Sequence, residues 1–501
     1  MSNSKNRTAL LIFGIVFMVI NTLAVVLFLN NPLLSDDDKY FFNIKTVLIL
    51  SGIGFGSFFI TLKCLNFLTI KKLFLIFIII RIVILYFFVT FNYAVETDFA
   101  LATPWVQKVF NGDLFTPYFP IDSWIADTWR IVPPMFMWWY TYSYWIYGLD
   151  IILWRVVNLF LEVGIVYVMI QIFQENSATE KGWTEENFKI GLSFYIFSFL
   201  PIIAILLYGN IIAFPVLLGI LGFLFFFRSK KNPKNLYYAV FFFCLAALTE
   251  YFAAIWILGI LLIELFQKNF RRLLILIGEI VAVFCLVTLP FLINDALGFL
   301  QRIVWHFKVY SINLDGTIWA FNYRLFNWPE IISILPALIA LTLTIGYIYK
   351  NYKSEISLNQ LLVIICIFEF FTPGFNPFHY LWIFPLICLN IIYSLRKFFI
   401  TNLLFLGYHL FFMFWLLTAY LTYSGPIYPL FKDTFTAIEV FHMAPSGYFV
   451  VLPLIGQLTF QIGFIYLIFS LTKSKTLILS LLLPFIVYYI FNICVPTTFY
   501  Y

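Results

Sequence analysis

The amino-acid sequence predicts an all-α fold, a polytopic bundle of transmembrane helices. Of its 501 residues, 63% are hydrophobic and only 11% are charged. A soluble protein with this balance could not cover its surface with polar groups, so lipid must form part of its surroundings. Apolar runs long enough to cross a hydrocarbon layer of roughly 30 Å recur from one end of the chain to the other. No segment is typical of a large soluble domain.

The first apolar run covers residues 10–29 and follows two basic residues, Lys5 and Arg7. It is longer than the core of an ordinary secretion signal, and the residues after it, Asn30 to Leu34, offer no small-residue cleavage site. We therefore expect a retained first helix with the amino terminus in the cytoplasm.

Apolar runs between polar breaks predict about 13 to 15 membrane spans. They lie near residues 10–29, 46–62, 73–91, 131–148, 151–173, 188–207, 211–227, 235–265, 273–293, 331–349, 358–372, 379–395, 402–422, 447–471 and 476–495. With the first helix entering from the cytoplasm, most clusters of Lys and Arg fall inside, as the positive-inside rule requires. The cluster at residues 228–231 falls outside on this count, so we expect a re-entrant or broken helix between residues 188 and 265.

The spans and their connections divide the chain into three parts. Residues 1–72 hold extra amino-terminal membrane helices, residues 73–330 a middle membrane module, and residues 331–501 the carboxy-terminal membrane helices. The middle module contains two long outer loops, at 92–130 and 294–330. Loops of this length are uncommon unless they are functional or disordered, and their many Trp, Tyr and Phe residues favour order at the membrane interface.

The first outer loop carries two carboxylates just beyond the end of a membrane helix. Glu96 and Asp98 are two residues apart, so in an extended segment they share one side. Thr103 and Pro104 then predict the start of a short interfacial helix, which Gly112 would end. Such a helix would hold Asp98 at the depth of the lipid headgroups, where a carboxylate can act as a general base. An ordinary acidic exterior loop is the alternative.

Basic side chains near the outer loops suit a phosphate group. Arg130 lies at a membrane boundary, where its planar guanidinium can donate two parallel hydrogen bonds to a phosphate. The second outer loop and the start of a later helix add Arg302, His306, Lys308, Arg324 and His379. Cations beside aromatic rings suit a leaving lipid phosphate, because they stabilise developing negative charge. Attraction to lipid headgroups and interfacial packing explain the same residues as well.

Five sequence motifs follow one another along the chain. The first outer loop contains Glu-Thr-Asp-Phe (96–99), Asn-Gly-Asp-Leu-Phe-Thr-Pro-Tyr (111–118) and Trp-Arg-Ile-Val-Pro-Pro (129–134). Later come Tyr-Gly-Asn (208–210) and Phe-Asn-Pro-Phe-His-Tyr-Leu-Trp-Ile-Phe-Pro (375–385). In order and spacing these motifs resemble those of polytopic glycosyltransferases of the GT-C superfamily, and the nearest likeness is to the GPI mannosyltransferase I type.

The resemblance covers about residues 73–395. It implies a GT-C fold with interfacial helices and loops on the outer face, and a donor sugar on a polyprenyl phosphate. By position, Asp98 matches the family's loop aspartate, Arg130 its basic residue before the proline-rich helix start, and Asn210 its Gly-Asn segment. Relatives often carry a lysine where this chain has Leu-Thr-Glu-Tyr at 248–251, which leaves the exact donor and acceptor open.

We therefore expect a hexosyltransferase, with mannose the favoured sugar, that acts on an extracytoplasmic glycan, lipid or protein with inversion. Asp98 is the expected base and Glu96 orients the acceptor, while the cations named above and Asn210 bind substrate. The sequence predicts no cofactor and no metal ligands, although a divalent ion stays open, and it predicts no nucleic-acid partner. The expected location is the cell membrane or the endoplasmic reticulum, with the site on the outer face.

The main alternative is a transporter or lipid flippase. Glu162, Glu250 and Glu369 lie in apolar spans, where an ionised acid costs about 2.5 to 3.5 kcal/mol on insertion scales. Such groups can carry protons or bind a substrate, and the outer loops would then only gate. A non-catalytic assembly subunit is a third possibility, which would tolerate the loss of every carboxylate named here.

Overall fold

The computed structural model describes residues 56–57, 60–61, 63–90, 106–107, 110–112, 134–148, 150–177, 183–198, 201–207, 211–313, 335–353, 358–371, 380–389, 462 and 465–483. Every regular element in these ranges is a helix, which confirms the all-α prediction. Two of the described helices are long and apolar enough to cross a membrane, over Ile152–Asn176 and Phe270–Ile293.

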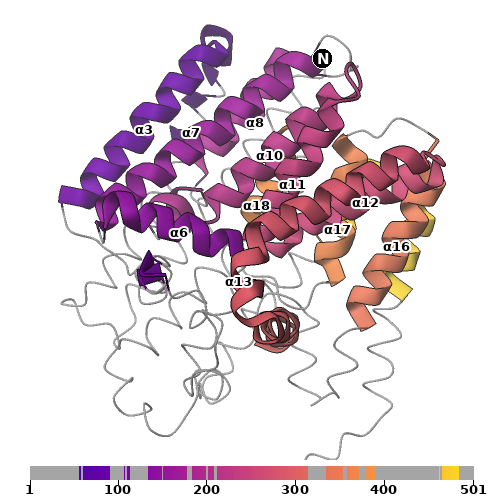
Figure 1. Cartoon of the computed structure of the whole chain (residues 1–501). Coiled ribbons are helices and arrows are strands. Elements are labelled where there is room, and N and C mark those ends of the chain that lie inside the picture. The colour runs from indigo at the N-terminus through magenta and orange to yellow at the C-terminus, as the bar shows by residue number, and fades with distance from the viewer. Residues whose placement is uncertain are drawn as a thin grey trace, which may run out of the picture.

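The helices form one bundle (Figure 1). Its first half consists of η1 (Leu65–Phe67), α3 (Ile70–Thr90), α6 (Pro134–Tyr147), α7 (Ile151–Asn176), α8 (Glu185–Phe197), the π-helix η3 (Ile202–Leu207) and α10 (Ala213–Arg228). Its second half consists of α11 (Asn235–Thr249), η4 (Tyr251–Ala253), α12 (Ala254–Phe266), α13 (Phe270–Asn313), α16 (Leu335–Asn351), α17 (Leu358–Phe371) and α18 (Tyr380–Leu389).

Local sequence sets several of the helix ends. The Asp150 carboxylate accepts hydrogen bonds from the first backbone N–H groups of α7, and the Thr184 hydroxyl does the same for α8. Gly148, with a φ of 61°, ends α6 and lets the chain turn directly into α7. The turn between α6 and α7 is therefore tight.

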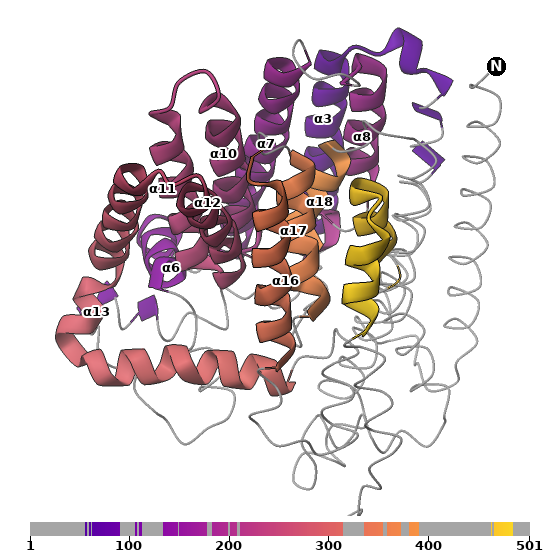
Figure 2. The same ribbon diagram turned by 90° about the vertical axis from the view of Figure 1, so that its right-hand side faces the viewer.

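One end of the bundle gathers basic residues, and we call it the basic end; the opposite end is the far end. Arg228 Nε, at the end of α10, donates to Glu175 Oε1 near the end of α7 at 2.8 Å. Gln267 Nε2, after α12, donates to the Tyr352 carbonyl after α16 at 3.0 Å. Figures 1 and 2 place these helix ends and the start of α3 on one side of the bundle. The basic residues at these helix ends are Lys71, Lys72, Arg228, Lys230, Lys231, Lys234, Lys268, Arg271, Arg272, Lys350 and Lys353.

Helix α6, which covers most of the span predicted at 131–148, lies across the far end (Figure 1). The ring of Trp139 stacks on Phe214 at the start of α10, with 4.0 Å between centroids. Trp138 Nε1 donates to the Val287 carbonyl of α13 at 2.9 Å. An α-helix of this length extends about 21 Å, which is short for a hydrocarbon layer, and a helix rich in Trp and Tyr suits the membrane edge instead.

The span predicted at 235–265 is two helices. Helix α11 ends at Thr249, and Glu250 has an extended backbone with φ −147° and ψ 121° before η4 and α12 follow. Because α11 starts at the basic end and α12 returns to it, the segment enters and leaves the bundle on one side. This confirms a broken helix between residues 188 and 265. The cluster at 228–231, at the turn between α10 and α11, lies at the basic end with the other basic residues.

Helix α13 is longer than predicted. It continues as a helix to Asn313, where the sequence predicted an outer loop from residue 294 onward. Pro290 lies inside it, and proline bends a helix because its ring removes one backbone hydrogen bond. Figure 2 shows the result: an upright part from Phe270 and an arm that lies across the far end. We call residues 294–313 the α13 arm.

The core is tightest where α10 meets α11 and α12. The ring of Phe223 lies 5.1 Å from that of Phe243 and 4.7 Å from that of Trp256. A Cβ atom on Gly222 would lie 2.6 Å from ring atoms of Phe243, so only glycine allows this approach. Close packing here fixes α11 and α12 against α10.

Candidate functional site

A row of three polar side chains follows one face of α7 inside the bundle. Arg155, Asn158 and Glu162 are three and four residues apart, so they share that face. Their relative exposures are 2%, 0% and 0%. Charged side chains are almost never fully buried unless they are paired. The row therefore depends on partners from neighbouring elements.

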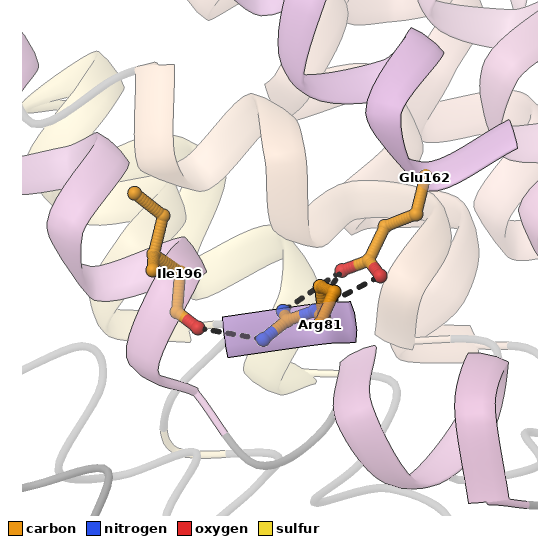
Figure 3. A network of polar contacts seen from close by, with 3 residues as sticks. All are labelled: Arg81, Glu162 and Ile196. Atoms are coloured by element: carbon orange, nitrogen blue, oxygen red, sulfur yellow. Dashed lines mark hydrogen bonds and ion pairs between the residues drawn. The ribbon is translucent and has the colours of Figure 1, made fainter. Parts of the chain in front are cut away.

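Glu162 forms a two-pronged ion pair with Arg81 of α3 (Figure 3). Arg81 Nε lies 3.1 Å from Glu162 Oε1 and 3.0 Å from Oε2, and Arg81 Nη2 lies 2.8 Å from Oε1. Neither side chain has any exposed surface. Each charge therefore neutralises the other where water cannot do so.

The same arginine also contacts a third helix. Arg81 Nη1 donates to the Ile196 carbonyl at 2.9 Å. This carbonyl belongs to the last turn of α8, where backbone carbonyls find no N–H donor within the helix. The ring of Phe77, one turn earlier on α3, lies 5.0 Å from Arg81 Cζ. The buried charge pair thus joins α3, α7 and α8 at one point.

Below the ion pair, the row meets the π-helix η3. Asn158 Nδ2 donates to the Ile205 carbonyl at 3.5 Å. Turns of π-helix are rare and occur often at functional sites, because they re-aim the chain. Arg155 lies nearest the start of α7, so the row runs from the ion pair toward the far end. The π-helix itself leads along the chain to Asn210, which lies outside the described residues.

The predicted catalytic pair, Glu96 and Asp98, lies outside the described residues, and so do Arg130, Arg324 and His379. The structure does describe the helix ends to which their segments connect. Residues 91–133 connect α3 to α6, residues 208–210 connect η3 to α10, residues 314–334 connect α13 to α16, and residues 372–379 connect α17 to α18. All these connections leave from helix ends at the far end (Figures 1 and 2).

Part of the first outer loop is described and packs on α6. Residues 106–107 and 110 are helical, and Gly112 follows with a φ of 87°, which confirms the predicted stop of the short helix; its predicted start at Thr103 and Pro104 lies outside the described residues. Gln107 Nε2 donates to the Tyr144 hydroxyl at 3.3 Å, and the ring of Phe110 lies edge-on to Tyr144 at 5.5 Å. The helix that follows Asp98 in sequence is therefore held against α6.

Three of the predicted substrate-binding residues, Arg302, His306 and Lys308, lie on the α13 arm and not in a loop. A helix is the more rigid support for such groups. Phe299 of the arm is buried and stacks with Phe291, with 6.2 Å between ring centroids. The arm is thereby fastened to the far end.

The carboxylates of the transporter hypothesis belong to different elements of the chain. Glu162 is held by Arg81, Glu250 sits at the break between α11 and α12, and Glu369 belongs to α17 with a side chain outside the described part. A glutamate fixed by two-pronged pairing is poorly suited to carry protons. The analysis of the sequence overlooked Arg81, although an arginine inside the apolar run 73–91 was a signal that a buried partner exists.

Comparison of the chain with known protein families, with curated proteins and with solved structures finds no match. In its described residues the fold is all-helical, with at least two helices able to cross a membrane, a buried ion pair and a far end from which the segments that carry the motifs leave the bundle.

Proposed function

We propose that the protein is a multi-pass membrane glycosyltransferase similar to the GT-C superfamily. It moves a hexose, mannose by preference, from a polyprenyl phosphate to an acceptor outside the cytoplasm. The observation that supports this proposal is that the helix ends flanking four connections, which contain Asp98 and other predicted site residues, all lie at the far end. Segments remote in sequence can build one site only if they meet at one end.

The distribution of charge supports the orientation. Basic residues gather at the opposite end of the bundle, and positively charged ends of membrane helices stay in the cytoplasm. The upright part of α13 turns large apolar side chains outward, among them Leu274, Leu286 and Ile293, with 69%, 76% and 74% exposure. Side chains of this kind suit lipid far better than water. The far end then faces the cell exterior or the lumen.

Two elements support a site at the depth of the headgroups. Helix α6 exposes Tyr142 and Trp145, residue types that prefer the membrane interface. The α13 arm lies across the same end and exposes Leu297. A sugar linked to a polyprenyl phosphate lies in the layer between such elements when its isoprenoid tail stays in the hydrocarbon.

The proposed reaction is a single displacement. Asp98 accepts the proton of an acceptor hydroxyl, whose oxygen attacks the anomeric carbon. The bond from that carbon to the phosphate oxygen breaks, and polyprenyl phosphate leaves with the electron pair. Arg130 and the cations of the α13 arm stabilise the negative charge that develops on the phosphate. Attack opposite the leaving group inverts the anomeric configuration.

The buried ion pair supports this chemistry indirectly. Helix α3 ends at Thr90, shortly before Asp98 in sequence, and Arg81 fixes α3 against α7 and α8. A base works only when it is held within hydrogen-bonding reach of its proton. Arg81 is therefore a positioning residue and not a catalytic one.

Replacing the base tests the proposal. We expect Asp98→Asn to lower sugar transfer from radiolabelled polyprenyl-phosphate mannose by about 10²-fold or more, because general base catalysis contributes that much. Asp122→Asn, in the same loop and outside the motifs named above, is the matched control and should keep near-normal transfer. Full activity of Asp98→Asn, in protein that is inserted and folded, would refute the assignment of the base.

A further inference from the structure

A second charged region lies at the basic end, where α12, α13 and α16 meet. Lys268 follows α12, Arg271 begins α13, and Lys350 and Lys353 end α16; all four side chains are exposed. These three helix ends meet at the upper right of Figure 1. Like charges gathered at one place repel one another unless an anion lies among them.

The ends of α12 and α16 are held together. Gln267 Nε2 donates to the Tyr352 carbonyl, and the ring of Phe266 lies 5.3 Å from Tyr349 and 5.9 Å from Tyr352. Lys353 Nζ lies 6.0 Å from the centroid of the Tyr352 ring. Because these contacts join the residues next to the cations, the positions of Lys268 and Lys353 relative to each other are set by the fold.

Nearby acids do not neutralise the cluster. Among the described residues at this junction, the carboxylate is Glu264, which is 5% exposed and bonds Arg272 Nη1 at 3.2 Å. The four exposed cations therefore lie outside that pair. Glu355 follows two residues after Lys353 and belongs to the undescribed part of the chain.

The backbone of Lys268 is a further sign of a role for this side chain. Its φ is 61°, in the left-handed region that glycine or asparagine usually occupies after a helix. A lysine is disfavoured there, yet the Lys268 and Asn269 amides still close the end of α12 on the Leu265 and Glu264 carbonyls. The turn thus presents a cation where a neutral residue would be easier to accommodate.

Below the cations the surface becomes apolar. Leu274, Ile275 and Ile277 on the first turns of α13 are exposed, and so is Tyr349 on the last turn of α16. The first backbone N–H groups of α13 add a partial positive charge beside Arg271. Cations above, an aromatic ring at the boundary and apolar side chains below match a phospholipid, with its phosphate at the cations and its acyl chains along α13.

We propose that this junction binds an anionic phospholipid of the cytoplasmic leaflet. The proposal rests on the membrane placement given above but not on sugar transfer. Three helix ends that are remote in sequence form this site, and the Gln267–Tyr352 hydrogen bond joins two of them. The cluster Lys230, Lys231 and Lys234 instead belongs to the single turn between α10 and α11.

Photocrosslinking tests the site. The full chain is reconstituted in phosphatidylcholine vesicles with a minor share of photoactivatable phosphatidylglycerol, and adducts are mapped by mass spectrometry. We expect adducts to concentrate at residues 266–277 and 349–353. The triple variant Lys268→Gln, Lys350→Gln, Lys353→Gln should lower them about tenfold or more, since each cation near an anionic surface contributes on the order of 1 kcal/mol.

The control removes equal charge elsewhere: Lys230→Gln, Lys231→Gln, Lys234→Gln should leave these adducts within about twofold, as only diffuse attraction changes. Arginine at the three test positions should retain the adducts, which separates loss of charge from misfolding.

Adducts spread evenly over all basic turns, or an equal loss in the control, would overturn the proposal. Competition by inorganic phosphate as effective as that by unlabelled lipid would overturn the lipid assignment. Sugar transfer is not read out, so failure here leaves the glycosyltransferase proposal untouched.

Discussion

Two arginine–glutamate pairs of the same chemistry lie in different surroundings. Arg81 and Glu162 meet in the middle of the bundle with no exposed side-chain surface, whereas Arg228 and Glu175 meet at the basic end with 34% and 24% exposure. Water can solvate either member of the second pair if its partner is lost. In the first pair, no water can replace a lost partner, and neither charge has a second counter-charge among its contacts with described residues. Position within the bundle, not the pair itself, decides what the interaction is worth.

The largest effect is expected from breaking the buried pair. Glu162→Gln leaves the Arg81 charge in an apolar core without a counter-charge, so we expect stability to fall by about 3 to 5 kcal/mol. Denaturant unfolding in detergent micelles measures this change.

Removing both charges provides the control. The double variant Arg81→Met, Glu162→Leu leaves no buried charge and should regain most of the lost stability. A loss below about 1 kcal/mol in Glu162→Gln alone would contradict the view that the pair is isolated from water.

A much smaller effect is expected at the basic end. Glu175→Gln should cost between 0 and about 1 kcal/mol, because Arg228 stays partly solvated. The difference from the wild type should shrink further when salt is added, since exposed charges are screened. An effect as large as that of Glu162→Gln would mean that the two sites are equally dry, and the comparison would fail.

The positions of the helices could be predicted from the sequence better than their directions, breaks and lengths. Hydropathy locates apolar runs, but it does not give the direction of a helix within the bundle, and the apolar and aromatic α6 lies across the far end. The break at Glu250 has no proline or glycine to mark it, and tertiary packing of Phe252 against Trp256 and Trp382 helps to hold it. The α13 arm was mistaken for a loop because its polar residues interrupt the hydropathy of the span before it.

The site was predictable only in part. The short helix ending at Gly112 followed from its turn signals. Glu162 was marked as buried, but its partner Arg81 lies 81 residues away, and nothing in a single sequence pairs two such residues. The roles of Asp98 and Arg130 rest on their motifs, and both stay predictions.

The measurement that tests the account most directly is the sidedness of its two ends. In a variant without the natural cysteines, Thr97→Cys and Ser229→Cys are introduced one at a time, and intact cells are treated with a membrane-impermeant maleimide. If the protein lies in the cell membrane, we expect labelling at position 97 in intact cells and labelling at position 229 only after permeabilisation. If it lies in the endoplasmic reticulum, we expect labelling at 97 in sealed microsomes whose lumenal face is turned outward. Equal labelling of both positions in intact cells, or the reverse order, would contradict this sidedness.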